Sequence, residues 1–414
     1  MNVVEKYIYD MVKAYPELKD NIVNLYRRIF SLIPGDPVMT DLTIIVRENY
    51  FFGFHDKSPW SADNTMLLAH NHTIGNKYPG QDDEVGIGYF IGEDWCNYVP
   101  VTTSRAWNWQ TGSMLQWIGT SHSFIFNDFN GMKHISKKYN CVDQTTIEYP
   151  YPIAAVSHNG KYAVSHSFNR LRSRLGSTSY GYANGADSDE NVKISLSESL
   201  KLIDLAAGSI KPLIRLKDIV LYAPNKSMDN AYHYFTHCLF SPQNDRIAFF
   251  HRWINSARQE FTRMFTCNID GSDLFLFKMN NMVSHIAWED NSTILAYGDI
   301  DGIEQYYLLK DKTEKNEYLN VNVFNENGHP SYSTKGLIIT DTYPDRKGYL
   351  SLMLYDKEKK LLNVLAKLRT PYSFRGGIKC DLHPRWDRTS QFICFDSAHT
   401  GIRALCTMRV LNDS

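Results

Sequence analysis

Residues 385–397 read RWDRTSQFICFDS, which is a bulky residue, a polar turn and then an apolar run. This order is typical of two antiparallel strands joined by a short turn. The same pattern occurs seven times between Trp60 and Asp396. The copies begin at Pro59, Leu115, Ala155, Leu239, Ile286, Ser331 and Arg385. One such unit per blade predicts an all-β chain that folds as a seven-bladed β-propeller.

The spacing of the copies supports this interpretation. They begin mostly 40–56 residues apart, close to the ~40–50 residues of a four-stranded blade. One interval is about 84 residues long and is rich in arginine, glycine, serine and tyrosine. We therefore predict a long insertion over residues 167–224 in the third blade, where loops on a rigid scaffold often carry function.

The two ends of the chain have different patterns. Only one strand, IRALCTMRV (402–410), follows the last copy, so LTIIV (42–46) is expected to complete the last blade and close the ring. Apolar residues before it recur at helical spacing, interrupted by Pro16. The sequence thus predicts a small N-terminal helical segment over 1–40 and the propeller over 41–414.

Composition excludes several classes of protein. The 414 residues are 43% hydrophobic and 21% charged, which is enough apolar material for a sizeable core. Lysine and arginine (44) balance aspartate and glutamate (45), so no global field attracts nucleic acid or a membrane. Seven scattered cysteines without a CxxC pair, and no secretory or membrane-spanning stretch, lead us to expect a cytoplasmic protein.

Histidines stand near the start of several predicted innermost strands. They are His55, His237, His285, His329 and His383. In a propeller these strand starts converge on the central channel, so the imidazoles are expected to form a site. Cys380 and Asp381 add a thiolate and a carboxylate, and this donor set suits Zn²⁺ or Mn²⁺. The alternative is that each histidine is a hydrogen-bonded core residue.

A second group combines cations with aromatic rings. His251, Arg252 and Trp253 end the second strand of the fourth blade. The predicted insertion adds Arg170, Arg172, Arg174, Tyr180 and Tyr182. Together they are expected to form a basic, aromatic-lined groove for a carboxylated sugar, because the planar arginine fork fits a carboxylate. The alternative is a solvated arginine loop with packing tyrosines.

Several segments resemble a known family. They are SRAWNWQTGSMLQW (104–117), RLRSRLGSTSYGY (170–182), FTHCLFSP (235–242), GHPSYS (328–333), TDTYPDR (340–346) and CDLHPRW (380–386). They are similar to propeller proteins related to the oligogalacturonate lyases and ulvan lyases, over roughly residues 50–410. Where oligogalacturonate lyases carry His-Pro-His-Pro, this chain has DLHP at 381–384.

The resemblance implies a metal-assisted lyase that cleaves a uronic-acid glycoside by β-elimination. It implies His237 or His251 as the base, Tyr182 or Tyr180 as the acid and Arg172 as the group that neutralises the carboxylate. Arg170, Arg174, Tyr180, Arg252 and Trp253 would bind the acidic oligosaccharide or polysaccharide. His285, His329, Cys380 and His383 would hold a divalent metal, Zn²⁺ or Mn²⁺.

Two other functions stay open at this stage. One is a non-catalytic propeller that binds a glycan or a protein partner in surface-polysaccharide metabolism. The other is a glycoside hydrolase, which requires a pair of carboxylates or a lone catalytic histidine in the channel mouth. The sequence offers no obvious carboxylate pair near the predicted channel.

Overall fold

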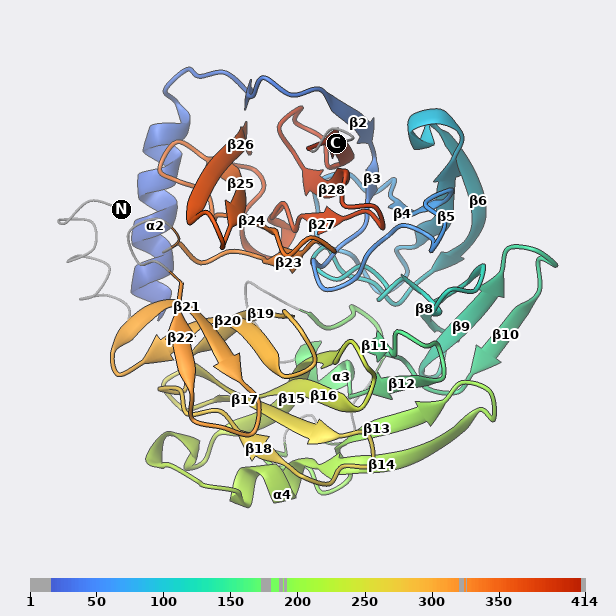
Figure 1. Cartoon of the computed structure of the whole chain (residues 1–414), viewed down its shortest axis with the longest axis vertical. Coiled ribbons are helices and arrows are strands. Elements are labelled where there is room, and N and C mark those ends of the chain that lie inside the picture. The colour runs from blue at the N-terminus through green and yellow to red at the C-terminus, as the bar shows by residue number, and fades with distance from the viewer. Residues whose placement is uncertain are drawn as a thin grey trace.

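The computed structural model describes residues 16–172, 180–185, 189, 192–319, 324 and 326–410. Seven antiparallel sheets are arranged around a central axis, like the blades of a propeller (Figure 1). The predicted seven-bladed β-propeller is therefore confirmed. Each predicted repeat forms the turn between the first and second strands of one blade.

The strands are given blade by blade, from the innermost strand outward. The first three blades contain β3 (Tyr50–Phe51), β4 (Leu67–Asn71), β5 (Val85–Ile91) and β6 (Asn97–Ser104); β7 (Gln116–Trp117), β8 (Ser123–Phe129), β9 (His134–Asn140) and β10 (Thr146–Tyr149); and β11 (Ala155–Val156), β12 (Tyr162–Ser165), β13 (Ser199–Asp204) and β14 (Ser209–Arg215). The fourth and fifth contain β15 (Tyr232–Phe240), β16 (Arg246–Ile254), β17 (Glu260–Asn268) and β18 (Phe275–Leu276); and β19 (Val283–Trp288), β20 (Thr293–Ile300), β21 (Ile303–Lys310) and β22 (Asn316–Tyr318). The last two contain β23 (Ser331–Tyr332), β24 (Ile338–Asp341), β25 (Tyr349–Asp356), β26 (Leu361–Arg369) and β1 (Val38–Met39); and β27 (Arg385–Trp386), β28 (Phe392–Ser397), β29 (Ala404–Arg409) and β2 (Ile44–Glu48).

The ring closes by pairing the two ends of the chain. Strand β2 runs antiparallel to β29, with Ile44 opposite Met408 and Glu48 opposite Ala404. The prediction that residues near 42–46 complete the last blade is confirmed. Strand β1 adds a fifth strand to the sixth blade through pairing with β26. The propeller sheets therefore begin at Val38, within the predicted 1–40 helical segment.

The expected insertion over 167–224 is divided by regular blade structure. Strands β13 and β14 lie inside it and complete the third blade. The connection from β12 to β13 contains helix α3 (Asn169–Arg172). The connection from β14 to β15 contains α4 (Leu216–Leu221) and the 3₁₀ turn η2 (Lys226–Met228). Two connections thus share the extra length that the repeat spacing indicates.

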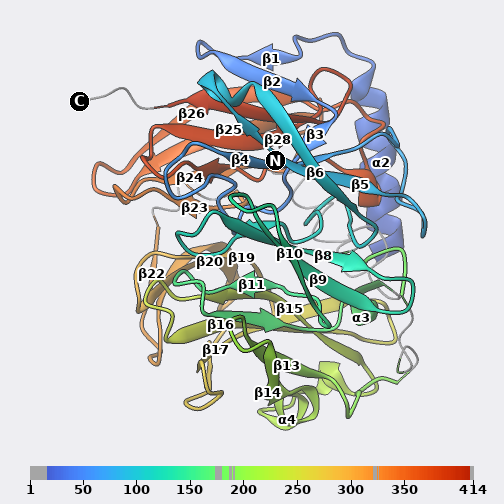
Figure 2. The ribbon, with the colours of Figure 1, turned by 90° about the vertical axis from the view of Figure 1, so that its right-hand side faces the viewer.

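Helix α2 (Pro16–Ser31) precedes the propeller and lies along one face of the disc (Figure 2). Proline suits the first position of a helix because the N–H that it lacks has no partner there. Arg369 of β26 donates to the carbonyls of Ser31, Ile33 and Gly35, just past the last turn. A cation is favourable there because it meets the negative end of the helix dipole. Among the described residues, no helix has the length and apolar character needed to span a membrane.

Neighbouring blades are joined by polar side chains on their second strands. Each one accepts a hydrogen bond from a backbone N–H of the segment that enters the next blade. The pairs are His70 with Ser113, Asn127 with Ile153, Asp341 with His383 and Asp396 with Phe52, at 2.7–3.1 Å. These bonds fix the short segments that line the channel, which have few backbone partners of their own.

Asp396 also holds the joint where the ring closes. Its carboxylate accepts from Phe52 and Gly53 of the first blade and pairs with Arg385 at 3.1 Å, and both charged side chains are buried. Arg385 in turn donates to the carbonyl of Phe54. The ion pair therefore anchors the chain just before the first channel histidine. The two remaining 3₁₀ turns are η1 (Glu93–Trp95) and η3 (Gly376–Ile378).

We predict that Asp396→Ala lowers the free energy of unfolding by about 3–5 kcal/mol, because the buried Arg385 loses its counter-ion. Urea denaturation followed by circular dichroism measures this. Asp82→Ala, at an exposed position in the first blade, is the control and is expected to change stability little. Equal stability of the two variants would contradict the role of Asp396 in closing the ring.

Candidate functional site

Five histidines converge on the side chain of Phe54 at the centre of the propeller. The phenyl ring lies 4.6–6.0 Å, between ring centroids, from His55, His237, His285, His329 and His383. The convergence that the repeat positions predict is thus present. Sequence reasoning did not single out Phe54, although it directly precedes His55.

Local distortions of two inner strands lie at His237 and His285. The pairing of β15 with β16 shifts register between Thr236 and Leu239, and that of β19 with β20 shifts between Val283 and Ile286. His237 also has a positive φ of 51°, which is uncommon for a residue with a Cβ. Bulges of this kind re-aim side chains and are common beside functional sites. Here they lie where two imidazoles meet the channel centre.

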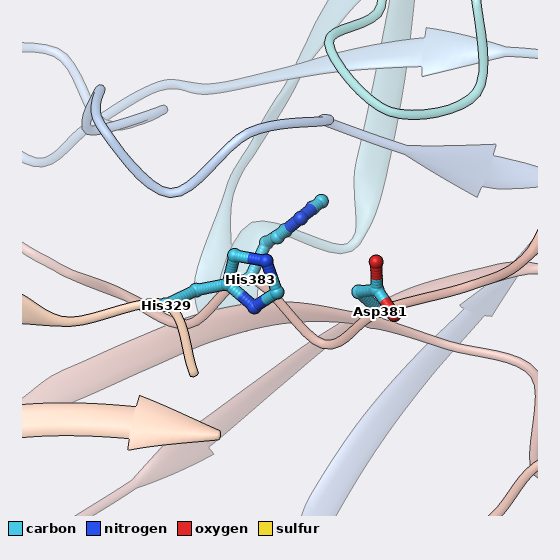
Figure 3. A group of neighbouring side chains, drawn as sticks. All are labelled: His329, Asp381 and His383. Carbon is cyan, nitrogen blue, oxygen red and sulfur yellow. The ribbon is translucent and has the colours of Figure 1, made fainter. Parts of the chain in front are cut away.

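Among the described residues, His329, Asp381 and His383 form a group of side chains that could hold a metal ion. All three are buried, and one potential ligand atom from each lies within 4.8 Å of the others. Figure 3 shows them on the segments that precede β23 and β27. The ring of His329 is 4.2 Å from that of His383 and 4.1 Å from that of His285, between centroids.

Asp341 positions two members of this group. Its Oδ1 accepts from the backbone N–H of His329 at 2.8 Å and lies 2.7 Å from Nδ1 of the same residue. Its Oδ2 accepts from the backbone N–H of His383 at 2.9 Å. An imidazole whose Nδ1–H is held by a carboxylate keeps Nε2 available as a ligand. Asp341 therefore has the position of an outer partner that orients metal ligands.

The donor atoms fit a divalent metal ion. Nε2 of His383 and Oδ1 of Asp381 are buried and have no hydrogen-bond partner among the described residues. Burial and the nearby His329 hold the pKa of His285 and of His383 well below the ordinary value, so both rings are neutral, as ligands must be. Two imidazoles and one carboxylate suit Mn²⁺ or Zn²⁺.

Cys380 does not belong to this group, in contrast to the predicted metal set. Its side chain lies in an apolar cluster with Phe374 and Ala398. Burial raises the pKa of the thiol to about 12, so the thiolate that a metal requires is disfavoured. Asp381 instead offers the third potential ligand atom of this group. It stands at the first position of the DLHP segment at 381–384.

A lysine and a tyrosine lie beside the acidic ligand. Lys379 Nζ is 2.6 Å from Asp381 Oδ2 and 5.0 Å from the ring centre of Tyr343. Burial opposes ionisation of Asp381, but Lys379 and His329 outweigh it, and the pKa of the carboxyl is lowered. Tyr343 is 39% exposed and its ring is 5.7 Å from that of His329, between centroids, so solvent approaches the group on this side.

A second group lies on another side of Phe54. The rings of Tyr180 and His237 meet edge to face at 5.1 Å, and the Arg252 guanidinium lies 5.9 Å from the ring centre of Tyr180. Arg252 pairs with Glu260 at 2.9 Å. Burial and the nearby Arg252 lower the pKa of His237 well below the ordinary value. His237 is therefore a neutral imidazole, and its Nε2 has no hydrogen-bond partner among the described residues.

Other predicted site residues point elsewhere. Adjacent side chains of a strand face opposite ways, so His251 and Trp253 lie on the face of β16 that Arg252 does not use. His251 contacts His233 and Arg263 at 3.0 and 3.2 Å, and Trp253 stacks on Phe261.

Of the predicted insertion residues whose side chains the structure describes, Tyr180 alone contacts the rings around Phe54. Tyr182 is fully buried, stacks on Phe168 and accepts a hydrogen bond from Asn127. Arg170 donates to backbone carbonyls, including that of His233. The side chain of Arg172 and all of Arg174 lie outside the described residues.

Comparisons with known proteins show the fold. No protein-family model and no curated protein matches the sequence. An oligogalacturonate lyase in complex with manganese has a TM-score of 0.63 at 13% identity, covering 92% of this chain and 99% of that chain. An oligogalacturonate lyase from Vibrio parahaemolyticus has a TM-score of 0.60 at 12% identity, covering 92% of this chain and 99% of that chain. A puromycin-hydrolysing peptidase from Mycobacterium tuberculosis has a TM-score of 0.50 at 12% identity, covering 84% of this chain and 53% of that chain.

We predict that the purified protein binds Mn²⁺ or Zn²⁺ and that Asp381→Asn and His383→Ala abolish this binding. Asp341→Asn should weaken binding by about 10–100-fold, because the ligands keep their chemistry but lose their orientation. Isothermal titration calorimetry on chelator-treated samples of the original protein and of these three variants measures the metal affinity. Cys380→Ser is the matched control and should retain the affinity of the original protein. Loss of binding in Cys380→Ser but not in Asp381→Asn would refute the assignment.

Proposed function

We propose that the protein is a metal-assisted lyase that cleaves a uronic-acid glycoside by β-elimination. The observation that carries this proposal is the meeting, around Phe54, of a buried carboxylate–imidazole ligand set with the neutral imidazole of His237. The similarity in fold to oligogalacturonate lyases, one of them in complex with manganese, supports it.

The reaction class explains the kinds of residue that are present. Elimination removes the proton on C5, next to the uronate carboxylate, and breaks the bond between C4 and the glycosidic oxygen. A C4–C5 double bond forms, and the departing oxygen takes up a proton, so no water is consumed. The enzyme must supply a base, an acid and positive charge near the carboxylate. A divalent ion held by His329, Asp381 and His383 would supply such charge.

His237 is the candidate base. Its Nδ1 lies 2.7 Å from Thr236 Oγ1. When Nδ1–H donates to that hydroxyl, Nε2 keeps its lone pair and accepts the C5 proton. The low pKa of His237 keeps the ring neutral before the reaction.

Tyr180 is the candidate acid, and its ring contacts His237. Burial raises the pKa of its hydroxyl, so the phenol holds a proton that it can donate to the leaving oxygen. After the product leaves, exchange with water removes the proton from His237 and restores the proton of Tyr180. Arg252 and Lys379 both act electrostatically on Tyr180 and add positive charge to this region.

A non-catalytic propeller that binds an acidic glycan is the second candidate. The position of Phe54 favours it, because this ring contacts both His237 and His383 and so lies between the candidate base and the candidate metal ligands. In that case oligosaccharides would bind without being cleaved.

The decisive assay incubates the protein and Mn²⁺ with galacturonate- and glucuronate-containing oligosaccharides and follows the ultraviolet absorbance of the unsaturated product. We expect cleavage of at least one uronate, and a decrease in kcat of about 10²–10⁴-fold in His237→Ala. Tyr180→Phe should also lower kcat. Tyr182→Phe is the matched control and should retain the original kcat, because Tyr182 packs in the core. Binding of every substrate without product would favour the second candidate.

A further inference from the structure

A basic pocket lies between helix α2 and the loops of the sixth and seventh blades. Its volume is about 350 Å³. Four of its lining residues are Arg27, Lys347, Arg369 and His399, and none of the described lining residues is acidic. A pocket with several cations and no carboxylate attracts an anion. Neither the candidate metal ligands nor His237 lines it.

Arg27 is the residue that indicates a ligand. Its side chain is partly buried, yet its guanidinium has no hydrogen bond or ion pair with any described residue, and its Nε is buried. Burial lowers the pKa of Arg27, and the electrostatic effect of Asp381 opposes this lowering only in part. Thr370 adds a second buried donor, since its Oγ1 has no partner in the described part of the chain. Buried donors of this kind normally have partners.

The contrast with Arg369 is informative because both arginines line the pocket. The guanidinium of Arg369 is engaged by backbone carbonyls at the end of helix α2 and by that of Lys347. Arg369 therefore holds the helix against the sixth blade. This contact places Arg27, one turn earlier on the same helix, at the pocket with its donors available.

One loop connects this pocket to the channel site. The segment after β26 lines the pocket with Thr370, Pro371 and Tyr372 and then continues to Lys379 and Asp381. Arg403 and Gln110 both donate to the carbonyl of Lys379 and so hold the far end of this loop. Asp381 also contributes to the electrostatic environment of Arg27. The pocket and Asp381 therefore lie along the same connecting segment of the chain.

We infer that this pocket is a second anion subsite, which binds another carboxylate of the acidic oligosaccharide whose cleaved uronate occupies the channel. The inference rests on the proposed function for the identity of the ligand. Arg27 and Lys347 contact the carboxylate, and Thr370 donates a hydrogen bond to it. Helix α2 thus contributes to substrate binding, and the protein favours oligosaccharides long enough to span both sites.

The first experiment tests the pocket without any saccharide. Thermal unfolding is followed in sodium sulfate and in sodium chloride at equal ionic strength, because a bound anion raises Tm by mass action. Sulfate should raise Tm in the original protein and in Arg28→Gln, and clearly less in Arg27→Gln. Arg28 is the matched control, since it is an exposed neighbour on the same helix and the charge change is the same. An equal sulfate response in Arg27→Gln and Arg28→Gln would overturn the subsite.

The second experiment tests the ligand. Calorimetry with uronic-acid disaccharides and hexasaccharides should show a roughly 10-fold weaker Kd for the hexasaccharide in Arg27→Gln, and an unchanged Kd for the disaccharide. Lys347→Gln, at an exposed position where folding is not at risk, should act in the same direction, with exposed Lys335→Gln as its control. Equal losses for both lengths would refute a second subsite. An Arg27-dependent sulfate response in a protein that cleaves no uronate would refute the proposed function but not the anion site.

Discussion

The candidate site depends on the buried carboxylate of Asp341. This one side chain accepts the backbone N–H of His329, contacts the ring of the same residue and accepts the backbone N–H of His383. His329 enters the sixth blade and His383 enters the seventh, so Asp341 fixes two segments that are far apart in sequence. Both imidazoles consequently lie beside Asp381 at the channel. A carboxylate with no exposed surface is tolerated there because it accepts several hydrogen bonds.

Asp341 is one case of a constraint that acts around the ring. Polar side chains of β4, β8 and β28 bind the segments that enter the neighbouring blades in the same way. Innermost strands of only two residues, such as β23 and β27, provide few ladder bonds. Side-chain acceptors therefore decide where the channel-lining residues lie. The joints at Asp341 and Asp396 hold the segments that carry His383 and Phe54, and the basic pocket under helix α2 lies on the loop that leads to Asp381.

The fold could be predicted from the sequence because the repeat indicates a local hairpin seven times. The last blade lacks one strand, and this gap indicated which N-terminal segment closes the ring. The channel histidines were predictable for the same reason, since equivalent positions converge. Directions of individual side chains were not predictable. The sequence does not separate Cys380 from Asp381, Tyr182 from Tyr180, or His251 from Arg252. The local twist, the bulges and the packing decide which residue of each pair faces the channel. Asp341 could have been identified from the sequence, because Asp341 and Asp396 both lie near the end of the second strand in adjacent copies of the repeat.

We expect the channel to hold a divalent metal between the sixth and seventh blades. The most direct measurement is an anomalous difference map from crystals of the protein grown with Mn²⁺. We predict one strong peak within coordination distance of His329 Nε2, His383 Nε2 and a carboxylate oxygen of Asp381, with Asp341 still bound to both histidine segments. A channel without a peak, or a peak bounded by Cys380 and not by Asp381, would contradict it.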